Sequence, residues 1–500
     1  MSAPRSLQSL LAGYGAPAPD LEVTGVEMDS RRVAPGDLFL ACQGSGGPRS
    51  HGLAHLEQAL QRGAAAVAWE PAAGWAQPEI AVPEIAVERL STRVGEIAAR
   101  FHGRPSERLF SVGVTGTDGK TSTAYLIAQA LDRANAPCAY LGTIGIGRVG
   151  QLGRATHTTP DPVSLQRLLA QFLGEGAQAC AMEVSSHALD QARVAGMHFD
   201  AAVLTNITRD HLDYHGTVEN YAAAKRRLFT WPDLGWAILN RDDAHGARWA
   251  TERSGTTQVL VYGLEGVVPA GPHAIGRELR LTPQGLSLRV ETHRGSAQLE
   301  SRLLGRFNAY NLLAAMAVLL CKGLEPQAAA TLLAQSQTVP GRIEGFRGPR
   351  AAPLVVVDYA HTPDALGQIL RAVRAHTPAR LICVFGCGGD RDRGKRPLMG
   401  AAAAELADEV IVTDDNPRSE VPALIVSEIL AGIPASRRPA VQVVHERAEA
   451  IRAAVLAGGA QDVVVVAGKG HEDTQTYGGE VRAFSDRRFV AELLGAPLPC

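Results

Sequence analysis

The stretch from Phe110 to Ser122 constrains the fold most strongly, because an apolar run breaks there into glycines and then into Lys120-Thr121-Ser122. The apolar residues 110–114 have the composition of a buried parallel strand. After the loop, residues 124–131 carry apolar side chains three and four positions apart, which predicts a helix. A strand, a glycine-rich turn and a helix in this order predict a phosphate-binding loop.

The residue types in this loop favour a nucleoside triphosphate as the ligand. Gly116 and Gly119 allow the backbone to curl so that its amides face inward, and the following helix adds the positive end of its dipole. Lys120 is expected to reach the terminal phosphates, and a hydroxyl of Thr121 or Ser122 can bind Mg²⁺. The alternative is a glycine-rich turn that binds no ligand. This alternative is disfavoured because the strand, glycines, lysine, hydroxyls and helix follow one another in the order of a phosphate-binding loop.

Length and composition limit the class of protein. A chain of 500 residues is too long for one core and predicts two to four domains. Its formal charge of −2 argues against nucleic-acid binding driven by bulk charge. No apolar segment is long enough to span a bilayer and residues 1–5 begin no signal peptide, so we expect a cytoplasmic protein with reduced cysteines. Cys383 and Cys387 lack a second ligand pair, so no zinc site is predicted.

The first two predicted domains comprise residues 1–88 and 89–338. The first is a small α/β domain, with a Pro35-Gly36 turn before a short strand and a helical pattern over 52–64. The second is a larger α/β domain around the phosphate loop, in which helical patterns alternate with strands. Further strands of this domain are predicted at 139–144, 179–184, 201–207 and 236–239, and an antiparallel segment at 279–304 turns at 283–285.

The third predicted domain comprises residues 339–500 and repeats the pattern of a parallel sheet. Its strands are predicted at 354–357, 381–385, 409–412 and 463–466. A polar loop follows each strand, at 358–361, 386–396, 414–418 and 468–472. Because the carboxyl ends of parallel strands meet at one edge, the four loops predict a second substrate site there.

Polar clusters also follow the strands of the second domain, at 157–161, 182–193 and 206–213. Glu183 stands at the end of a strand, where a buried carboxylate is costly without a cation. Glu183 and His211 are therefore candidate metal ligands, although each alone is more often a structural residue. Lys225 lies in a helical pattern over 221–229, and its surroundings in the sequence indicate a solvated surface lysine.

On these motifs the chain resembles the Mur ligases of peptidoglycan synthesis, and within them the members that add meso-diaminopimelate. The resemblance covers nearly the whole chain and implies an α/β protein of three domains. These are an N-terminal UDP-sugar-binding domain, a central P-loop ATPase domain with a parallel sheet, and a C-terminal Rossmann-like domain that binds an amino acid. The matching segments are 29–31, 116–122, 158–160, 182–189, 206–213, 225, 308, 342, 358–361, 386–397, 415–418 and 468–472.

The chain departs from the family pattern at a few positions. Asp118 replaces an asparagine common in the phosphate loop, so its carboxylate is expected to point away from phosphates or to be neutralised by a cation. His157 also replaces a common asparagine. Ser45-Gly46-Gly47 does not match the loop of the first domain that usually follows Gly44.

The resemblance implies an ATP-dependent ligase. ATP would phosphorylate a carboxylate of UDP-N-acetylmuramoyl-L-Ala-D-Glu, and the amine of meso-diaminopimelate would attack the acyl phosphate. The products would be the UDP-N-acetylmuramoyl tripeptide, ADP and phosphate. The enzyme is expected to act as a monomer, to bind neither nucleic acid nor membrane, and to close its third domain onto the second when substrates bind.

The family also implies roles for individual residues. The catalytic residues would be Lys120, Glu183, His211 and Lys225, with two Mg²⁺ ions held by Thr121, Glu183, His211 and Lys225, the last carrying a CO₂-derived carbamate. ATP would be bound by Gly116, Thr117, Asp118, Gly119, Lys120, Thr121, Ser122, Asn308, Arg342 and Asp358. The UDP-sugar peptide would be bound by Met28, Ser30, His157, Thr158, Thr159, Ser185, Gln191 and Arg193. Diaminopimelate would be bound by Arg391, Asp415, Asn416, Pro417, Arg418, Gly468 and Glu472.

Three alternatives remain beside this hypothesis. An L-lysine-adding Mur ligase is disfavoured by Arg418, because a guanidinium can grip the second carboxylate that lysine lacks, while Glu472 could accept the distal ammonium. A folylpolyglutamate-type ligase would not be expected to carry the domain around Ser30. A nucleotide-gated binding protein would not need all four predicted catalytic residues, which are Lys120, Glu183, His211 and Lys225.

Overall fold

The computed structural model describes residues 3–14, 18–44, 50–155, 157–252, 256–349 and 351–498. The segment Ser45-Gly46-Gly47, which differs from the family pattern, lies outside these ranges. The chain forms two compact units, which are described separately. Unit 1 comprises Met1–Gly263, Pro269–His273 and Ala317–Leu324, and unit 2 comprises Leu264–Val268, Ala274–Met316 and Glu325–Cys500. Among the helices of the described ranges, none is both long enough and apolar enough to cross a bilayer.

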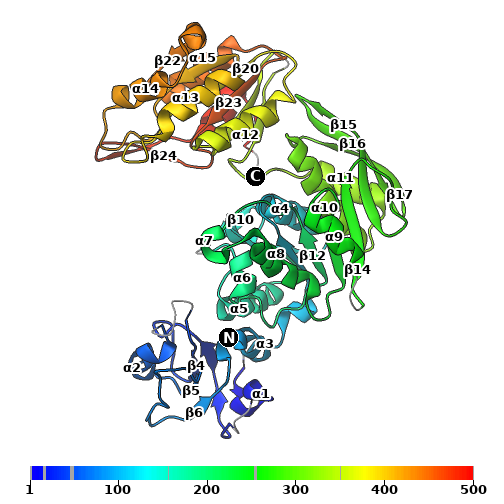
Figure 1. Cartoon of the computed structure of the whole chain (residues 1–500), viewed down its shortest axis with the longest axis vertical. Helices are drawn as coiled ribbons and strands as arrows, with labels where there is room; N and C mark the ends of the chain where they lie inside the picture. Colours follow the sequence, from blue (N-terminus) through cyan, green and yellow to red (C-terminus); the bar gives the residue numbers. More distant parts are fainter. Residues whose placement is uncertain are drawn as a thin grey trace. The chain divides into compact units, whose positions relative to one another are not determined.

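Unit 1 begins with a small α/β sheet of four parallel strands in the order β3-β4-β5-β6 (Figure 1). Its sheet separates two apolar cores, one of which receives α1 and α3 and the other α2. The predicted helix over 52–64 is shorter than expected, because a 3₁₀ turn precedes α2 and a Gly63 with φ +92° follows it. The elements are β1 (Arg5–Ser6), α1 (Leu7–Leu11), β2 (Glu22–Val23), β3 (Gly25–Glu27), β4 (Asp37–Ala41), α2 (Leu56–Gln61), β5 (Ala66–Trp69), β6 (Glu84–Ala86) and α3 (Val94–Phe101).

The larger sheet of unit 1 has the strand order β10-β9-β8-β11-β7-β12-β13-β14, with β7 near its centre. The strands from β8 to β14 pair in parallel, whereas β9 and β10 form an antiparallel edge. The predicted parallel sheet around the phosphate loop is therefore confirmed. The strands are β7 (Phe110–Thr115), β8 (Cys138–Gly142), β9 (Gly145–Arg148), β10 (Gln151–Gly153), β11 (Ala179–Glu183), β12 (Ala201–Leu204), β13 (Trp236–Asn240) and β14 (Gln258–Leu264).

Local sequence signals explain where the helices of this sheet begin. Asp161 caps α5 by accepting a hydrogen bond from the Ser164 amide, and Pro162 occupies the first helical turn, where its missing N–H costs nothing. Thr217 caps α8 in the same way. The helices are α4 (Lys120–Arg133), α5 (Pro162–Gly174), α6 (Ser186–Asp190), α7 (Leu212–His215), α8 (Val218–Arg226) and α9 (Ala244–Thr251).

Unit 2 contains an antiparallel segment and a second parallel sheet. In the antiparallel segment β16 pairs with β15 and β17, and the turn between β15 and β16 lies at Pro283-Gln284, as predicted. The second sheet has the order β18-β19-β23-β20-β21-β22, in which only β18 runs antiparallel. Its strands are β18 (Glu344–Arg347), β19 (Leu354–Asp358), β20 (Leu381–Phe385), β21 (Glu409–Val412), β22 (Val441–Val443) and β23 (Val463–Ala467); β15 is His273–Thr282, β16 Gly285–Thr292 and β17 Gly295–Ser301.

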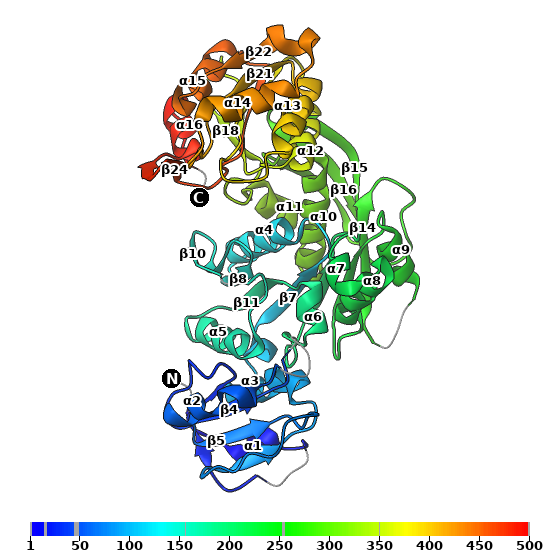
Figure 2. The same ribbon diagram turned by 60° about the vertical axis from the view of Figure 1, so that its left-hand side comes forward.

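Helices cover both faces of this second sheet. Apolar residues of α12, α13 and α14 pack on one face, and those of α15 and α16 pack on the other (Figure 2). A separate two-stranded hairpin, β24–β25, follows β23. The remaining elements are α10 (Arg306–Cys321), α11 (Pro326–Ala334), α12 (Pro363–Arg374), α13 (Lys395–Leu406), α14 (Pro422–Ala431), α15 (Arg447–Ala457), β24 (Thr474–Tyr477), β25 (Glu480–Ala483) and α16 (Asp486–Leu494).

A buried ion pair joins the first turns of α15 and α16. Arg447 donates from Nε and Nη2 to the two carboxylate oxygens of Asp486, at 2.7 Å each, and both side chains are fully buried. The arginine also donates to the carbonyl of Ala467, so its charge is surrounded by acceptors. Such a pair is costly to desolvate, and removing one partner is more costly still.

Asp486→Asn is therefore expected to destabilise unit 2, because it leaves the guanidinium of Arg447 buried without a counter-charge. We expect a loss of about 3–5 kcal/mol in the free energy of unfolding, measured by urea titration of the full chain. The control is Glu449→Gln, which breaks an exposed ion pair with Arg452 on the same helix and should cost less than about 1 kcal/mol. Equal unfolding midpoints for the two variants would contradict this account.

Candidate active site

The loop between β7 and α4 has the geometry that its glycines predict. Gly116 has φ +149° and Gly119 has φ +80°, both in the region that side chains rarely adopt. A Cβ on Gly116 would collide with the hydroxyl of Thr205, which itself donates to the carbonyl of Asp118 at 2.6 Å. Thr205, which directly follows β12, thus helps to hold the loop in place, and α4 begins at Lys120 with its amides toward the loop.

Two lysine side chains meet at one carbonyl of this loop. The Nζ atoms of Lys120 and Lys225 donate to the oxygen of Gly116 at 2.9 and 2.7 Å. Burial lowers the pKa of Lys120, and burial together with repulsion from Lys120 lowers the pKa of Lys225 well below its ordinary value. The prediction of a solvated Lys225 was wrong: the side chain is only 1% exposed.

Tyr221 links the loop to this lysine. Its hydroxyl lies 3.2 Å from the hydroxyl of Thr117, and the Nζ of Lys225 lies 4.5 Å from the centre of its ring. Burial raises the pKa of Tyr221 to about 12, so the ring stays neutral and can face a cation. His211 lies 6.1 Å from the same ring, measured between ring centres, and its side chain is 46% exposed.

Glu183 ends β11 beside the first turn of α4 and is buried. Its carboxylate accepts hydrogen bonds from the Thr121 hydroxyl at 2.9 Å and from the Tyr140 hydroxyl and Thr143 amide at 2.7 Å each. The carboxylate and hydroxyl oxygens are the hard ligands that Mg²⁺ prefers. Within the described ranges no cluster of three or more His, Cys, Asp or Glu side chains could bind a metal by itself, so a cation here would draw on hydroxyl oxygens and further ligands.

Half of the residues predicted to bind the sugar peptide come together beside Glu183. The Thr159 hydroxyl donates to the carbonyl of Glu183 at 2.8 Å and accepts from the Ser185 amide at 3.3 Å. Arg193 donates to the carbonyl of Thr159 at 3.2 Å and to the side chain of Gln191 at 2.6 Å. Hydrogen bonds therefore connect Thr159, Ser185, Arg193 and Gln191 into one row of polar groups beside the end of β11 and α6.

The remaining predicted contacts of the sugar peptide lie nearby in the chain or on the first sheet. The Thr158 hydroxyl lies 3.1 Å from that of Thr143, and His157 directly precedes it. Met28 and Ser30 follow β3, where the side chain of Glu27 accepts from the amide of Met28 at 3.0 Å. The Ser30 hydroxyl donates to the side chain of Gln58 at 2.7 Å.

In unit 2, the three residues predicted to bind nucleotide occupy helix and strand ends. Asp358 ends β19 and accepts hydrogen bonds from the amides of Ile343 and Ala360, while burial raises its pKa. Arg342 is exposed and lies 5.9 Å from the ring centre of Tyr359. Asn308 is buried in the first turn of α10, where it donates to the carbonyl of Leu304.

The residues predicted to bind diaminopimelate follow the parallel strands of unit 2. The side chain of Asn416 donates to the carboxylates of Asp415 and Glu472 at 3.0 Å each, and Gly468 lies against Asp415. Arg418 donates from Nη1 to the carbonyl of Gly389 at 2.6 Å, in the loop that also carries the exposed Arg391. The structure thus brings loops 386–396, 414–418 and 468–472 together, as predicted for parallel strands.

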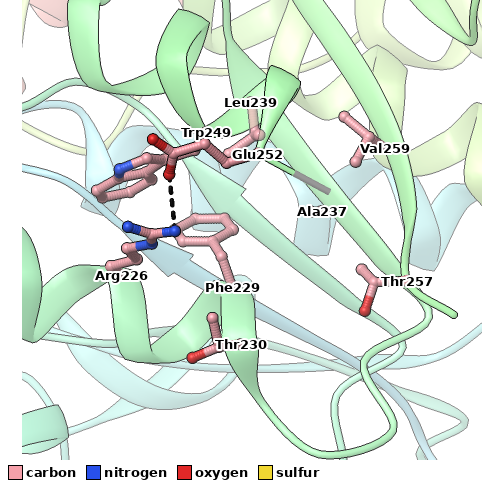
Figure 3. A pocket seen from close by; sticks show the side chains of 9 residues that line it. All are labelled: Arg226, Phe229, Thr230, Ala237, Leu239, Trp249, Glu252, Thr257 and Val259. Atoms are coloured by element: carbon pink, nitrogen blue, oxygen red, sulfur yellow. Dashed lines mark ion pairs between the residues drawn. The ribbon is translucent and has the colours of Figure 1, made fainter. Parts of the chain in front are cut away.

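A small cavity lies beside α8 in unit 1, and Arg226, Phe229 and Trp249 are among the residues that line it (Figure 3). Its volume is about 30 Å³, comparable to the space of one water molecule in the liquid, so it cannot hold a nucleotide. Arg226, the residue after Lys225, lines it and forms an ion pair with Glu252 at 2.7 Å. The two neighbouring basic side chains thus have different environments.

Sequence reasoning missed several supporting residues, among them Tyr140, Thr143 and Tyr221. Tyr221 precedes Lys225 by four residues, and this spacing on a predicted helix would have placed both on one face. Tyr140 and Thr143 come from β8 and the turn after it, and only the strand order places them beside Glu183.

Comparisons with known proteins agree with this architecture. Three family models match the chain: "Mur ligase family, catalytic domain" at 22–102, "Mur ligase middle domain" at 114–319 and "Mur ligase, glutamate ligase domain" at 341–470. A UDP-N-acetylmuramoyl-L-alanyl-D-glutamate--2,6-diaminopimelate ligase from Alkalilimnicola ehrlichii is 52% identical over 96% of both chains. The protein of the same name from Pseudomonas aeruginosa is 48% identical over 95% of this chain and 96% of its own.

A solved structure of a ligase with that name has the same fold as this chain. It is 36% identical, covers 99% of both chains and superposes with a TM-score of 0.80. The three matching domain models and these relatives confirm the α/β architecture of three domains, with a central nucleotide-binding domain. The chain therefore belongs to the Mur ligase family.

Proposed function

We propose that this protein is an ATP-dependent ligase that joins meso-diaminopimelate to UDP-N-acetylmuramoyl-L-Ala-D-Glu. The observation that carries the proposal is the 52% identity to a diaminopimelate ligase over 96% of both chains. ATP phosphorylates the terminal carboxylate of the peptide, the amine of the amino acid attacks the acyl carbon, and phosphate leaves as the amide forms. ADP and the tripeptide precursor are the other products.

The phosphate loop supports the first half of this reaction. The ammonium of Lys120 and the amides around Gly119 would offset the negative charge on the transferring phosphoryl group. Thr117, Asp118, Thr121 and Ser122 belong to the same loop and are proposed to contact ATP with it. For Asn308, Arg342 and Asp358 we propose the nucleotide contacts that the family resemblance implies. The exposed Asp118 is expected to keep its carboxylate away from the phosphates.

We further propose that Lys225 carries a carbamate derived from CO₂. An amine adds CO₂ only when neutral, and the lowered pKa of Lys225 favours the neutral form. The carbamate would replace a cation by a carboxylate-like acceptor beside the loop. Together with Thr121, Glu183 and His211 it would supply oxygen and imidazole ligands for two Mg²⁺ ions, which would neutralise phosphate charge.

The row of polar groups beside Glu183 is proposed to bind the acceptor peptide. Thr158, Thr159 and Ser185 offer hydroxyls, and the guanidinium of Arg193 is paired only with neutral acceptors in Gln191 and Thr159. A carboxylate of the peptide would therefore meet a guanidinium whose hydrogen bonds go to neutral groups, with Asp161 as a nearby anion. Met28, Ser30 and His157 are proposed to contact the UDP-sugar part of the substrate.

The loops of unit 2 are proposed to select the amino acid. Arg418 would hold the distal carboxylate of diaminopimelate, and Glu472 its distal ammonium, with Arg391, Asp415, Asn416, Pro417 and Gly468 completing the site. Lysine would leave the partly buried guanidinium of Arg418 without that partner, which disfavours it. The lysine-adding ligase is therefore the second candidate, and Arg418 and its loop are the residues of this chain that argue against it.

Phosphate release distinguishes these candidates. The protein would be incubated with ATP, Mg²⁺ and UDP-N-acetylmuramoyl-L-Ala-D-Glu, and then with meso-diaminopimelate, L-lysine or L-ornithine. We expect substantial release only with diaminopimelate. Preference for lysine would overturn the amino-acid assignment, and no release with any of the three would overturn the ligase.

Lys225→Ala is expected to lower kcat by about a thousandfold or more, because it removes the proposed carbamate and one ligand of the metal ions. Short carboxylates such as formate or acetate, added to the variant, should restore part of the activity. The neighbouring Arg226→Ala, which opens only the ion pair with Glu252, is the control and should keep kcat within about threefold. Full activity of Lys225→Ala would exclude the carbamate.

Arg418→Ala is expected to raise KM for meso-diaminopimelate by about a hundredfold, because a charged and directional contact is lost. KM for ATP should change by less than about twofold. The exposed Arg438→Ala serves as the matched control. A parallel rise of both KM values in Arg418→Ala would argue against a role in selecting the amino acid.

A further inference from the structure

The β24–β25 hairpin of unit 2 contacts the 414–418 loop along most of its length. None of the residues of β25 is buried, and within the hairpin only Gln475 is. An isolated two-stranded hairpin is marginally stable in water, so this one depends on what it binds. Its partners are the residues for which selection of the amino acid is proposed.

Gln475 makes the central contact. Its side chain is 4% exposed, and its Nε2 donates to the carbonyl oxygens of Asp415 at 2.9 Å and of Asp414 at 3.4 Å. A side-chain amide has two N–H donors, so one glutamine satisfies two successive carbonyls of the loop. This geometry fixes the direction of the backbone just before Asn416 and Arg418.

The next two residues of β24 continue the contact. The Thr476 amide donates to the side chain of Asn416 at 3.0 Å, and the Tyr477 hydroxyl donates to the carboxylate of Asp414 at 3.2 Å. Each residue from Gln475 to Tyr477 therefore binds a different part of the 414–418 loop. Several hydrogen bonds from the hairpin, and not a single one, therefore hold the conformation of this loop.

Arg418 is held in a backbone conformation that side chains rarely adopt. Its φ is +53°, and it pairs with Tyr477 as an isolated bridge. The Arg418 amide donates to the carbonyl of Thr476 at 2.9 Å, and the Gly478 amide donates to the carbonyl of Arg418 at 2.5 Å. A left-handed residue of this kind persists where its surroundings impose it, and here the hairpin supplies both bonds.

The hairpin also reaches the other proposed contact of the amino acid. Lys469 is completely buried, and its Nζ donates to the carbonyl of Thr474 at 2.6 Å and to the carboxylate of Glu472 at 3.0 Å. The first residue of β24 and the carboxylate of Glu472 are thereby tied to one ammonium. Arg418 and Glu472 are thus both positioned relative to the same short strand.

We propose that β24–β25 is a positioning element for amino-acid selection and that Gln475 is its principal positioning residue. The proposal rests on the proposed function, since it assumes that the 414–418 loop binds the incoming amino acid. Gln475 touches no substrate. It sets the spacing between the guanidinium of Arg418 and the carboxylate of Glu472, on which discrimination of a diamino diacid from a diamino monoacid depends.

The test uses Gln475→Met, which keeps the size of the side chain and removes both donors. We expect KM for meso-diaminopimelate to rise about tenfold, KM for ATP and for the UDP-sugar peptide to stay within about twofold, and the preference for diaminopimelate over lysine to fall. Gln475→Glu, which turns an oxygen toward the two carbonyls, should have a larger effect of the same kind.

The control is Glu480→Gln on the exposed strand of the same hairpin, which should match the wild type in every constant. Thermal melting of each variant separates misfolding from misplacement. The proposal is overturned if Gln475→Met keeps the wild-type KM and selectivity for diaminopimelate, or if KM for all substrates rises in parallel with a fall in melting temperature. A wild-type protein that releases no phosphate with diaminopimelate would instead overturn the proposed function itself.

Discussion

The chemistry of unit 1 depends on two amines that share the carbonyl oxygen of Gly116. Burial, and then repulsion from the ammonium of Lys120, lower the pKa of Lys225, so the deeper of the two amines is biased toward its neutral form. The same bias leaves Lys120, which lies nearer the solvent, as the cation of the loop. Under the proposed function, Lys120 would carry the positive charge that faces phosphate, and Lys225 would be the neutral amine that adds CO₂.

This division is set by elements far apart in the chain. Lys120 begins α4, Lys225 lies in the last turn of α8, and Gly116 follows β7, with Thr205, just after β12, leaving no room for a side chain at that glycine. The ring of Tyr221 lies one helical turn before Lys225 and faces its amine. Because the ring is neutral, it can pack against the protonated or the unprotonated amine without adding charge. A substitution at Thr205, the residue after β12, would therefore disturb the lysines without touching either of them.

Sequence reasoning predicted the central strands of both parallel sheets and the polar loops at their carboxyl ends, but not β14 or β22. Val-rich runs such as 354–357 and 463–466 have few alternatives to a buried strand. It failed for Lys225 because the neighbouring residues in the sequence, an alanine and an arginine, do not indicate that this lysine is buried. It also missed Tyr140 and Gln475, whose partners lie 43 and 60 residues away and become neighbours only through the strand order.

The sequence therefore determines the conformations of the phosphate loop and of the 414–418 loop in different ways. The curl of the phosphate loop comes from its own glycines, which a short motif can encode, although residues 205–208 also hold the loop through hydrogen bonds to Thr117 and Asp118. The 414–418 loop takes its conformation from a hairpin some sixty residues later, including the strained backbone of Arg418. Under the proposed function, substitutions in this hairpin would alter the choice of amino acid without contacting the ligand and without disturbing the phosphate loop.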